Sequence, residues 1–306
     1  MRGKKEILLA VVLGVIIPSV LMRSKFAKVI EDIEPGEVNP TSVLVLSGNE
    51  VLQMELEEYI TGVLLAEMPS GFEVEALKAQ AVAARTFTLF SIENGIKHQN
   101  ADVCTSAECC QGYLCPDEYL AAGGATTVVL KMRQAVGATQ GQVLYYGGNL
   151  IEATYFSSSG GKTESAIEVW GVSVPYLQSV SCDDTDGLFT KTISKKEFCR
   201  LLELSSGEVS IGKTIYTEGN GIAEVSINGE IFTGMQLRKL LGLRSTQISF
   251  YVGADSILIT TKGYGHRVGM SQYGANAMAE AGENYQQILT HFYTGVMIAV
   301  YDRERN

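Results

Sequence analysis

The sequence has few basic residues and no runs of them. Its 306 residues include 24 lysines and arginines against 34 aspartates and glutamates, which gives a formal net charge of −10. An acidic chain without basic runs, or basic residues interleaved with aromatic ones, repels a polyphosphate backbone. Nucleic acid is therefore not an expected partner, and a neutral or cationic substrate fits the charge better.

Internal repeats and a dinucleotide-binding fingerprint are also missing. The segment 263–269 is rich in glycine, but its third glycine is displaced and no strand–helix–strand context surrounds it. In and just after this segment lie the imidazole of His266, the amide of Gln272 and the phenol of Tyr273. These groups are typical of sugar-binding sites.

No small-residue cleavage site follows the apolar N-terminal run at 7–22, which has basic residues on both sides. We therefore expect residues 1–28 to be a retained membrane anchor, with a cleaved signal peptide as the main alternative and a buried core helix as a weaker one. The bulk of the chain would follow the anchor across the membrane. The polar residues 29–42 are expected to be a linker to a folded part at 43–306.

Hydrophobic periodicity predicts an α+β fold in the folded part, with helices and strands mixed around a catalytic region and a smaller β-rich lobe at about 190–262. Helices are predicted at about 55–66, 73–92, 126–136, 195–202, from 271 onward, and at 285–292. Strands are predicted around 223–227 and 256–261, and a hairpin is predicted for 143–146 and 151–156, with its turn at Gly147-Gly148.

Glu67 lies at the end of a predicted helix, directly before a Met-Pro-Ser-Gly break and inside an apolar stretch. Partial burial favours the protonated form of a carboxyl group, which a general acid needs near neutral pH. The alternative is an ordinary surface glutamate. Lys78 and Arg85 are seven residues apart on the next helix, so they share one face and could point into one cleft.

Ser271 lies in a Gly-Met-Ser-Gln-Tyr-Gly sequence that is similar to a nucleophile elbow, with His266 nearby. The spacing is one residue too long for that motif. A serine just before a helix more often caps its N-terminus, so we interpret Ser271 as a cap. His291, on the apolar face of the last predicted helix, is interpreted as a core or boundary residue.

Four cysteines lie within twelve residues, at 104, 109, 110 and 115, and two more lie at 182 and 199. Outside the cytoplasm the first expectation is a set of disulfides. Zinc is the competing interpretation, because clustered thiolates supply tetrahedral ligands, although the usual C-x2-C spacing is missing. His98 is close enough in sequence to join such a site.

Five stretches in this chain closely resemble the stage II sporulation protein D family, in the expected order and from about residue 43 onward. They are Tyr-Ile-x-Gly-Val-x-x-Ala-Glu-Met-Pro at 59–69, Ala-Leu-Lys-Ala-Gln-Ala-Val-Ala-Ala-Arg-Thr at 76–86, Ser-Ser-Ser-Gly-Gly at 157–161 with Trp170-Gly171 and Pro175-Tyr176-Leu177, Gly-x-Gly-His-x-x-Gly-Met-Ser-Gln-x-Gly-Ala at 263–275, and Tyr-x-x-Ile-Leu-x-His-Phe-Tyr at 285–293.

The resemblance implies a membrane-anchored, extracytoplasmic peptidoglycan lytic transglycosylase that acts when the mother-cell membrane engulfs the forespore. It implies Glu67 as the catalytic acid, zinc as the only cofactor to consider, and stage II sporulation proteins P and M as partners. Residues expected to bind the glycan are Lys78, Arg85, Tyr155, Ser157, His266, Gln272 and Tyr273.

In one respect the chain departs from this family pattern. Some members bind zinc through a Cys-x4-His-Cys-Gln stretch, which aligns with Cys104 and Cys109, so a cysteine replaces the histidine. A metal site or a disulfide at Cys104 and Cys109 both remain open. Two rival functions also remain: a noncatalytic glycan-binding enhancer of an amidase, and a metal-dependent hydrolase that uses the cysteine cluster.

Overall fold

The computed structural model describes residues 42–95, 97–184, 187–205 and 207–302. The predicted membrane anchor at 7–22 lies outside these residues. None of the helices within the described ranges combines the length and the hydrophobicity needed to cross a bilayer.

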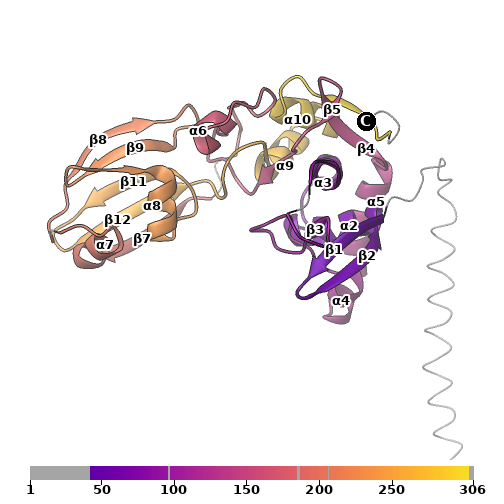
Figure 1. Cartoon of the computed structure of the whole chain (residues 1–306), viewed down its shortest axis with the longest axis horizontal. Helices are drawn as coiled ribbons and strands as arrows, with labels where there is room; N and C mark the ends of the chain where they lie inside the picture. Colours follow the sequence, from indigo (N-terminus) through magenta and orange to yellow (C-terminus); the bar gives the residue numbers. More distant parts are fainter. Residues whose placement is uncertain (1–41, 96, 185–186, 206, 303–306) are drawn as a thin grey trace, which may run out of the picture. The chain divides into compact units, whose positions relative to one another are not determined.

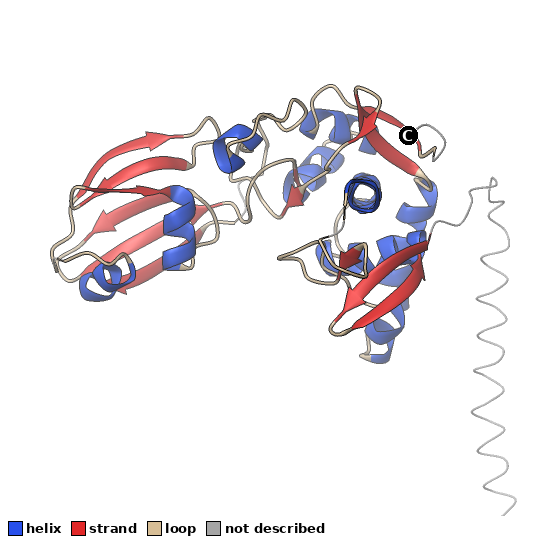
Figure 2. Ribbon diagram, viewed as in Figure 1, coloured by secondary structure: helices blue, strands red, loops and turns tan. Residues whose placement is uncertain are grey.

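The described chain is α+β, with helices and short strands alternating along it (Figure 2). The helices are α2 (Leu56–Glu67), α3 (Val74–Asn94), α4 (Pro116–Ala121), α5 (Thr126–Ala138), α6 (Ala166–Trp170), α7 (Lys195–Leu201), α8 (Gly234–Leu241), α9 (Gln272–Glu280) and α10 (Tyr285–Phe292). The strands are β1 (Ser42–Ser47), β2 (Glu50–Glu55), β3 (Val103–Cys104), β4 (Gln142–Tyr146), β5 (Asn149–Leu150), β6 (Tyr155–Phe156), β7 (Phe189–Ser194), β8 (Ile211–Tyr216), β9 (Ile222–Ile227), β10 (Glu230–Thr233), β11 (Gln247–Val252), β12 (Ser256–Lys262), β13 (Met270–Ser271) and β14 (Met297–Val300).

Helix α3 is the centre of the first hydrophobic core. It packs against α2, α5, α9, α10 and β4, and Figure 1 shows it end-on among them. Its alanines at 76, 79, 81, 83 and 84 are all buried. Because an alanine side chain is a single methyl group, neighbouring helices can approach the α3 backbone closely. The last turn of α2, which carries Glu67, is thereby held against a rigid element.

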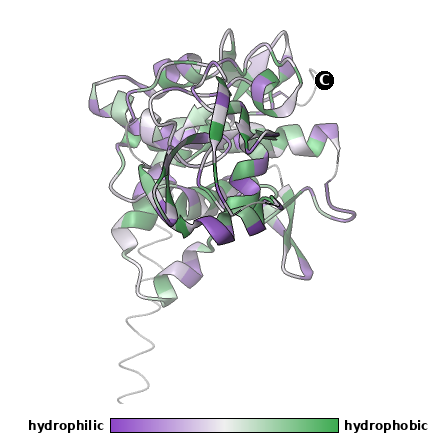
Figure 3. Ribbon diagram, turned by 90° about the vertical axis from the view of Figure 1, so that its left-hand side faces the viewer, coloured by the Kyte–Doolittle hydropathy of each residue, from purple (hydrophilic) through white to green (hydrophobic). Residues whose placement is uncertain are grey.

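A second hydrophobic core is formed by residues between 193 and 259. It joins the sheet β11-β12-β7, the sheet β10-β9-β8 and the helices α7 and α8, coloured orange in Figure 1. Hydrophobic and hydrophilic residues are mixed along these strands and helices in Figure 3, as expected of elements with one buried and one exposed side.

All six predicted helices are confirmed within about two residues at each end, and the 285–292 helix has the predicted bounds. The hairpin prediction is only partly right. Strand β4 pairs with β5 just after the Gly147-Gly148 turn, but Tyr155 and Phe156 pair in parallel with Met270 and Ser271 of β13. Sequence alternation shows that a segment is extended without showing which strand it pairs with, so this distant pairing was not predicted.

Candidate functional site

Glu67 lines a cavity of about 650 Å³. The wall is mostly polar and aromatic: Glu67, Phe87, Ala107, Glu108, Cys110, Thr154, Tyr155, Phe156, Ser157, Arg238, Tyr264, Gly265, His266 and Gln272. A second hollow, of about 500 Å³, is lined by residues 204–205, 208–210, 228 and 230, which include no histidine, cysteine or aromatic residue. The Glu67 cavity is therefore the candidate site, because it brings titratable, aromatic and amide groups together.

Helix α2 ends at Glu67 because Met68 is extended and Pro69 follows it. The carboxyl group is then held by two uncharged donors. The backbone N–H of Gly112 donates to Oε1 at 2.6 Å, and Nε2 of Gln272 donates to Oε2 at 3.3 Å. Glu67 pairs with no cation among the described residues. The carboxyl is thus oriented without a permanent countercharge.

Tyr155 lies beside Glu67 and is fixed from the other side. Its hydroxyl donates to Oε1 of Gln111 at 2.9 Å, and Nε2 of Gln111 donates to Oγ1 of Thr88 at 2.9 Å. Burial, and secondly the nearby charge of Glu67, raise the pKa of Tyr155 well above its ordinary value. The phenol therefore stays protonated and can act only as a hydrogen-bonding group near neutral pH.

His266 is a neutral donor or acceptor in this cavity. Burial, and then the positive charge of Arg238, lower its pKa to about 4, while a hydrogen bond with the Tyr155 backbone opposes the shift. Its Nδ1 accepts from the backbone N–H of Val268 at 3.1 Å, so the proton of the neutral ring is on Nε2. The ring lies 5.6 Å from that of Trp170, which is 41% exposed.

The β6–β13 pairing brings Tyr155 and Ser157 next to Gln272. Asp184, which sequence reasoning missed, holds the two strand ends together. Its carboxylate accepts from the backbone N–H groups of Ser159 and Gly160 and from the hydroxyls of Ser159 and Ser271. Asp184 lies in a loop with no recognisable motif, so no signal in the sequence indicated this role.

Ser271 caps α9, as predicted: its Oγ accepts from the backbone N–H of Gly274 at 3.1 Å. The same hydroxyl donates to Asp184, not to His266. No nucleophile–base pair is formed, which agrees with interpreting Ser271 as a cap. His291, whose Nε2 lies 2.8 Å from the carbonyl oxygen of Ser181, is a boundary residue.

The expectation that Lys78 and Arg85 face one cleft was wrong. Arg85 is fully buried and forms a bidentate pair with Glu57, with Nη2–Oε2 at 2.5 Å and Nε–Oε1 at 2.9 Å. Lys78 pairs with Glu75 at 2.6 Å. Neither residue lines the cavity that holds Glu67. A spacing of seven residues places both side chains on the same side of α3. That side faces neighbouring helices and strands that pack against α3, so it does not face a cleft.

Tyr273 also lies away from the cavity wall. Its ring packs edge-on against Phe72, with the ring centres 5.0 Å apart. Of the seven residues expected to bind substrate, the structure brings Tyr155, Ser157, His266 and Gln272 together around Glu67.

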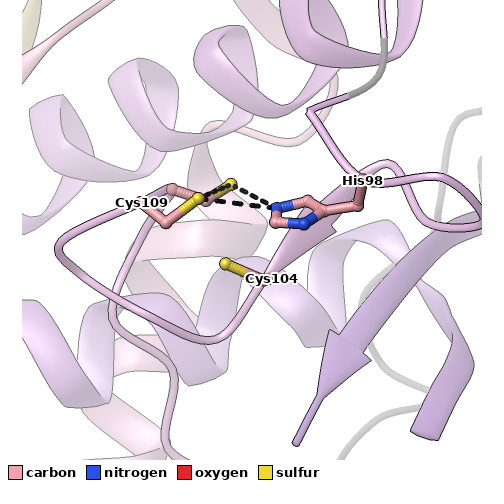
Figure 4. A group of neighbouring side chains, drawn as sticks. His98, Cys104 and Cys109 are labelled. Carbon is pink, nitrogen blue, oxygen red and sulfur yellow. Dashed lines mark hydrogen bonds between the residues drawn. The ribbon is translucent and has the colours of Figure 1, made fainter. Parts of the chain in front are cut away.

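His98, Cys104, Cys109 and Cys110 form a cluster beside this cavity, with their ligand atoms all within 4.8 Å of one another. Figure 4 shows the Cys109 sulfur facing the His98 ring, with the Cys104 sulfur near both. The Sγ atoms of Cys109 and Cys110 are 3.9 Å apart, and Nε2 of His98 lies 3.6 and 3.4 Å from them. Tetrahedral zinc with ordinary bond lengths requires separations of about 3.8 Å between sulfurs and about 3.5 Å between nitrogen and sulfur.

The cluster therefore fits zinc, with three thiolates and one imidazole. All six cysteines are free in the structure, so it does not favour the disulfide interpretation of Cys104 and Cys109. In such a site His98, from the segment after α3, would supply the imidazole, because position 109 is a cysteine in this chain.

Comparisons with known proteins give one consistent result. A family model described as "Stage II sporulation protein" matches residues 47–146. The stage II sporulation protein D of Bacillus amyloliquefaciens is 39% identical over 276 residues, which cover 86% of this chain and 80% of that protein. The protein of the same name from Bacillus subtilis is 37% identical, covering 88% and 82%. An amidase enhancer of Bacillus subtilis is 30% identical, covering 79% of this chain and 40% of the enhancer.

Proposed function

Because this chain belongs to the stage II sporulation protein D family of sporulation proteins, we propose that it is a lytic transglycosylase that cuts the glycan strands of peptidoglycan. The observation that carries the proposal is that the Glu67 carboxyl accepts hydrogen bonds from two uncharged donors and pairs with no cation among the described residues. Gly112 and Gln272 orient its carboxyl toward a cavity lined by hydroxyl, imidazole and amide groups, which are the groups that bind sugars.

In this mechanism Glu67 serves both steps. The protonated carboxyl donates its proton to the glycosidic oxygen as the bond to the anomeric carbon breaks. The resulting carboxylate then takes the proton from the C6 hydroxyl of the same sugar, whose oxygen bonds to the anomeric carbon. A 1,6-anhydro ring closes, no water enters, and Glu67 ends protonated as it began.

Four neighbouring groups position the substrate. Gln272 keeps one carboxyl oxygen of Glu67 in place, and the phenol oxygen of Tyr155, whose proton is donated to Gln111, can accept a hydrogen bond from a sugar hydroxyl. His266 contributes a neutral imidazole ring to the same wall. Ser157 adds a hydroxyl on the same wall. Because both Tyr155 and His266 are uncharged near neutral pH, neither competes with Glu67 for the reacting proton.

Zinc, if held by His98, Cys104, Cys109 and Cys110, would supply structural stability to the loop 104–112. That loop leads directly into the site. Gln111 accepts a hydrogen bond from the Tyr155 hydroxyl, and the backbone N–H of Gly112 donates a hydrogen bond to Glu67. The ligand residues, of which Cys110 itself lies on the cavity wall, would thus fix the positions of two active-site groups.

A hydrolase is the second candidate, because the cavity wall carries another carboxylate. Glu108, which sequence reasoning did not single out, is exposed on the loop 104–112. Hydrolases that cut glycosidic bonds usually use two carboxylates, one of which activates water or attacks the sugar. Glu67 and Glu108 could form such a pair, whereas a transglycosylase requires Glu67 alone.

The test is digestion of purified, peptide-free glycan strands by the protein alone, followed by mass spectrometry of the ends. A transglycosylase gives 1,6-anhydromuramyl ends, and a hydrolase gives reducing ends. A noncatalytic amidase enhancer leaves the strands intact, which would contradict the proposal. Loss of cutting with a chelator together with reducing-end products would indicate a metal-dependent hydrolase instead.

We also propose that the protein acts outside the cytoplasm, anchored by residues 7–22 in the mother-cell membrane and assembled with stage II sporulation proteins P and M. The family membership supports this arrangement. Extraction of membranes with alkaline carbonate tests the anchor, since an anchored protein stays in the pellet. Copurification tests the assembly.

A further inference from the structure

Arg238 reaches the Glu67 cavity from the part of the chain that has its own hydrophobic core. It lies on α8, which begins with a capping box between Thr233 and Gln236 and ends at Gly242 in the left-handed conformation. Both signals fix the helix ends. The guanidinium of Arg238 lies on the same cavity wall as Tyr264 and His266.

A buried ion pair ties this part of the chain to the cavity loops. Nη1 of Arg267 lies 3.2 Å from Oε1 of Glu164, and both side chains are fully buried. Oε1 of Glu164 also accepts from the hydroxyl of Thr217 and the backbone N–H of Gly221, and Nη2 of Arg267 donates to the Gly219 carbonyl at 2.6 Å. The β8–β9 turn is thereby fastened to the segment that carries His266.

Arg238 differs from the other arginines that the structure describes in this part of the fold and around α3. Each of four arginines has a carboxylate partner: Arg85 with Glu57, Arg133 with Glu58, Arg200 with Glu197 and Arg267 with Glu164. Arg244 instead stacks on the rings of Phe189 and Tyr264. The Arg238 guanidinium has no hydrogen-bond or ion-pair partner among the described residues.

This isolation has a cost, because Arg238 is only partly accessible to solvent and its burial lowers its pKa. A guanidinium stays protonated in proteins, so the charge remains and is poorly solvated. The chain as a whole carries a net charge of −10 and would repel an anionic ligand. An unpaired cation in the cavity offsets that repulsion at one place.

We infer that Arg238 binds a carboxylate carried by the glycan strand, and so determines which strands the site accepts. This inference rests on the proposed function. A planar guanidinium with free N–H groups matches a carboxylate in a bidentate arrangement. In peptidoglycan, carboxylates occur on the lactyl ether of muramic acid where no peptide is attached, and on the stem peptides. Arg238, not Lys78 or Arg85, is the cation that the cavity offers to them.

The test measures binding in a Glu67→Gln background, where strands are not cut. Arg238→Gln is compared with Lys239→Gln, which removes a neighbouring exposed charge from the same helix, and with Arg238→Lys, which keeps the charge. The ligands are peptide-free strands, strands with intact stem peptides, and N-acetylglucosamine oligomers, which have no carboxylate. Arg238→Gln should weaken binding of a carboxylate-bearing strand roughly 10- to 100-fold, the scale of a charged hydrogen bond. Arg238→Lys should recover part of this loss, and Lys239→Gln should leave binding unchanged.

The pattern of losses identifies the carboxylate. If Arg238→Gln weakens binding of peptide-free strands only, Arg238 binds the lactyl carboxylate. If it weakens binding of strands with stem peptides only, Arg238 binds a peptide carboxylate. If it weakens binding of both, Arg238 accepts both kinds of carboxylate. Unchanged binding of all three ligands, or an equal loss that includes the uncharged oligomers, would overturn the inference. The proposed function is judged separately, by whether the unsubstituted protein releases anhydromuramyl ends.

Discussion

Gly112 lies so close to Glu67 that a β-carbon at position 112 would come within 2.8 Å of the Glu67 Oε1 oxygen. The backbone N–H of the same glycine donates to that oxygen. The absence of a side chain at 112 is therefore what allows the carboxyl and the amide to meet.

Gly112→Ala should lower the cutting rate at least 10-fold while costing little stability. The added methyl meets the end of a flexible side chain, so Glu67 rotates away and loses the orientation that general acid catalysis needs. Rate and thermal unfolding are measured together. Gly71→Ala, where an added β-carbon meets nothing within 4 Å, is the matched control. A near-normal rate in Gly112→Ala would show that the hydrogen bond does not orient the acid.

Glu67→Gln should reduce the release of anhydromuramyl ends by roughly 100-fold or more, because the amide is too weak an acid to protonate the leaving oxygen. Glu108→Gln should retain most activity, because a transglycosylase needs no second carboxylate. Both rates are measured on peptide-free strands by mass spectrometry. If the two substitutions abolish activity equally, Glu67 and Glu108 work as a pair and the single-carboxylate mechanism is wrong.

Stability should fall as the pH drops from 7.5 to 5, partly because of His266. Its pKa is about 4 in the folded protein and about 6.5 when unfolded, so the unfolded state binds more protons in this range. The loss from this residue should be about 1 to 2 kcal/mol, allowing for partial solvent access. Denaturant unfolding at both pH values measures it. His266→Gln should lose less stability on acidification than the unsubstituted protein, and an unchanged pH dependence would contradict the assignment.

The purified protein should contain zinc, and His98→Ala or Cys109→Ser should remove it. Metal analysis measures the content, and chelation should lower the unfolding temperature until zinc is restored. Cys115→Ser is the control, because Cys115 is close in sequence but outside the cluster. Full-length protein that folds normally with no bound metal would exclude this site.

Arg85→Met should destabilise the fold by about 3–5 kcal/mol, since it leaves Glu57 without its buried partner. The activity of the remaining folded protein, measured well below the unfolding temperature, should change little. A large rise in KM with unchanged stability would instead restore Arg85 to the substrate-binding role that the sequence suggested.

Helices α2, α3, α5, α7, α9 and α10 were predicted from periodicity and from end signals in the sequence, whereas α4, α6 and α8 were missed, although α8 has a capping box and a glycine C-cap. The 285–292 helix is an example of a predicted one, with a buried Ile288-Leu289 pair and Asn284 as its N-cap. Glu67 was identified from a local break and a family motif. Pairings between distant segments were not predictable, because β6 and β13 are two residues each and more than 100 residues apart.

Two residues that contribute to the site, Arg238 and Asp184, were not predicted from the sequence, and the reason is the same for both. Arg238 lies on α8, which was not predicted, and it reaches the cavity only through the packing of a separate core. Asp184 acts through hydrogen bonds to a turn 25 residues away in the chain. In both cases the residue type is ordinary, and only the three-dimensional position gives it a role.

The loop 104–112 places a residue of the cysteine–histidine cluster, the acceptor for Tyr155 and the donor to Glu67 at three consecutive positions, 110, 111 and 112. Because of this arrangement, substitutions and insertions should be tolerated to different degrees at different positions of the loop. Residues 105–108 include no member of the cluster and neither partner of Tyr155 and Glu67, although Ala107 and Glu108 lie on the cavity wall. A single insertion between 110 and 112 would shift Gly112, the donor to Glu67, relative to the cysteine–histidine cluster. We therefore expect natural variation to be confined to the first half of the loop.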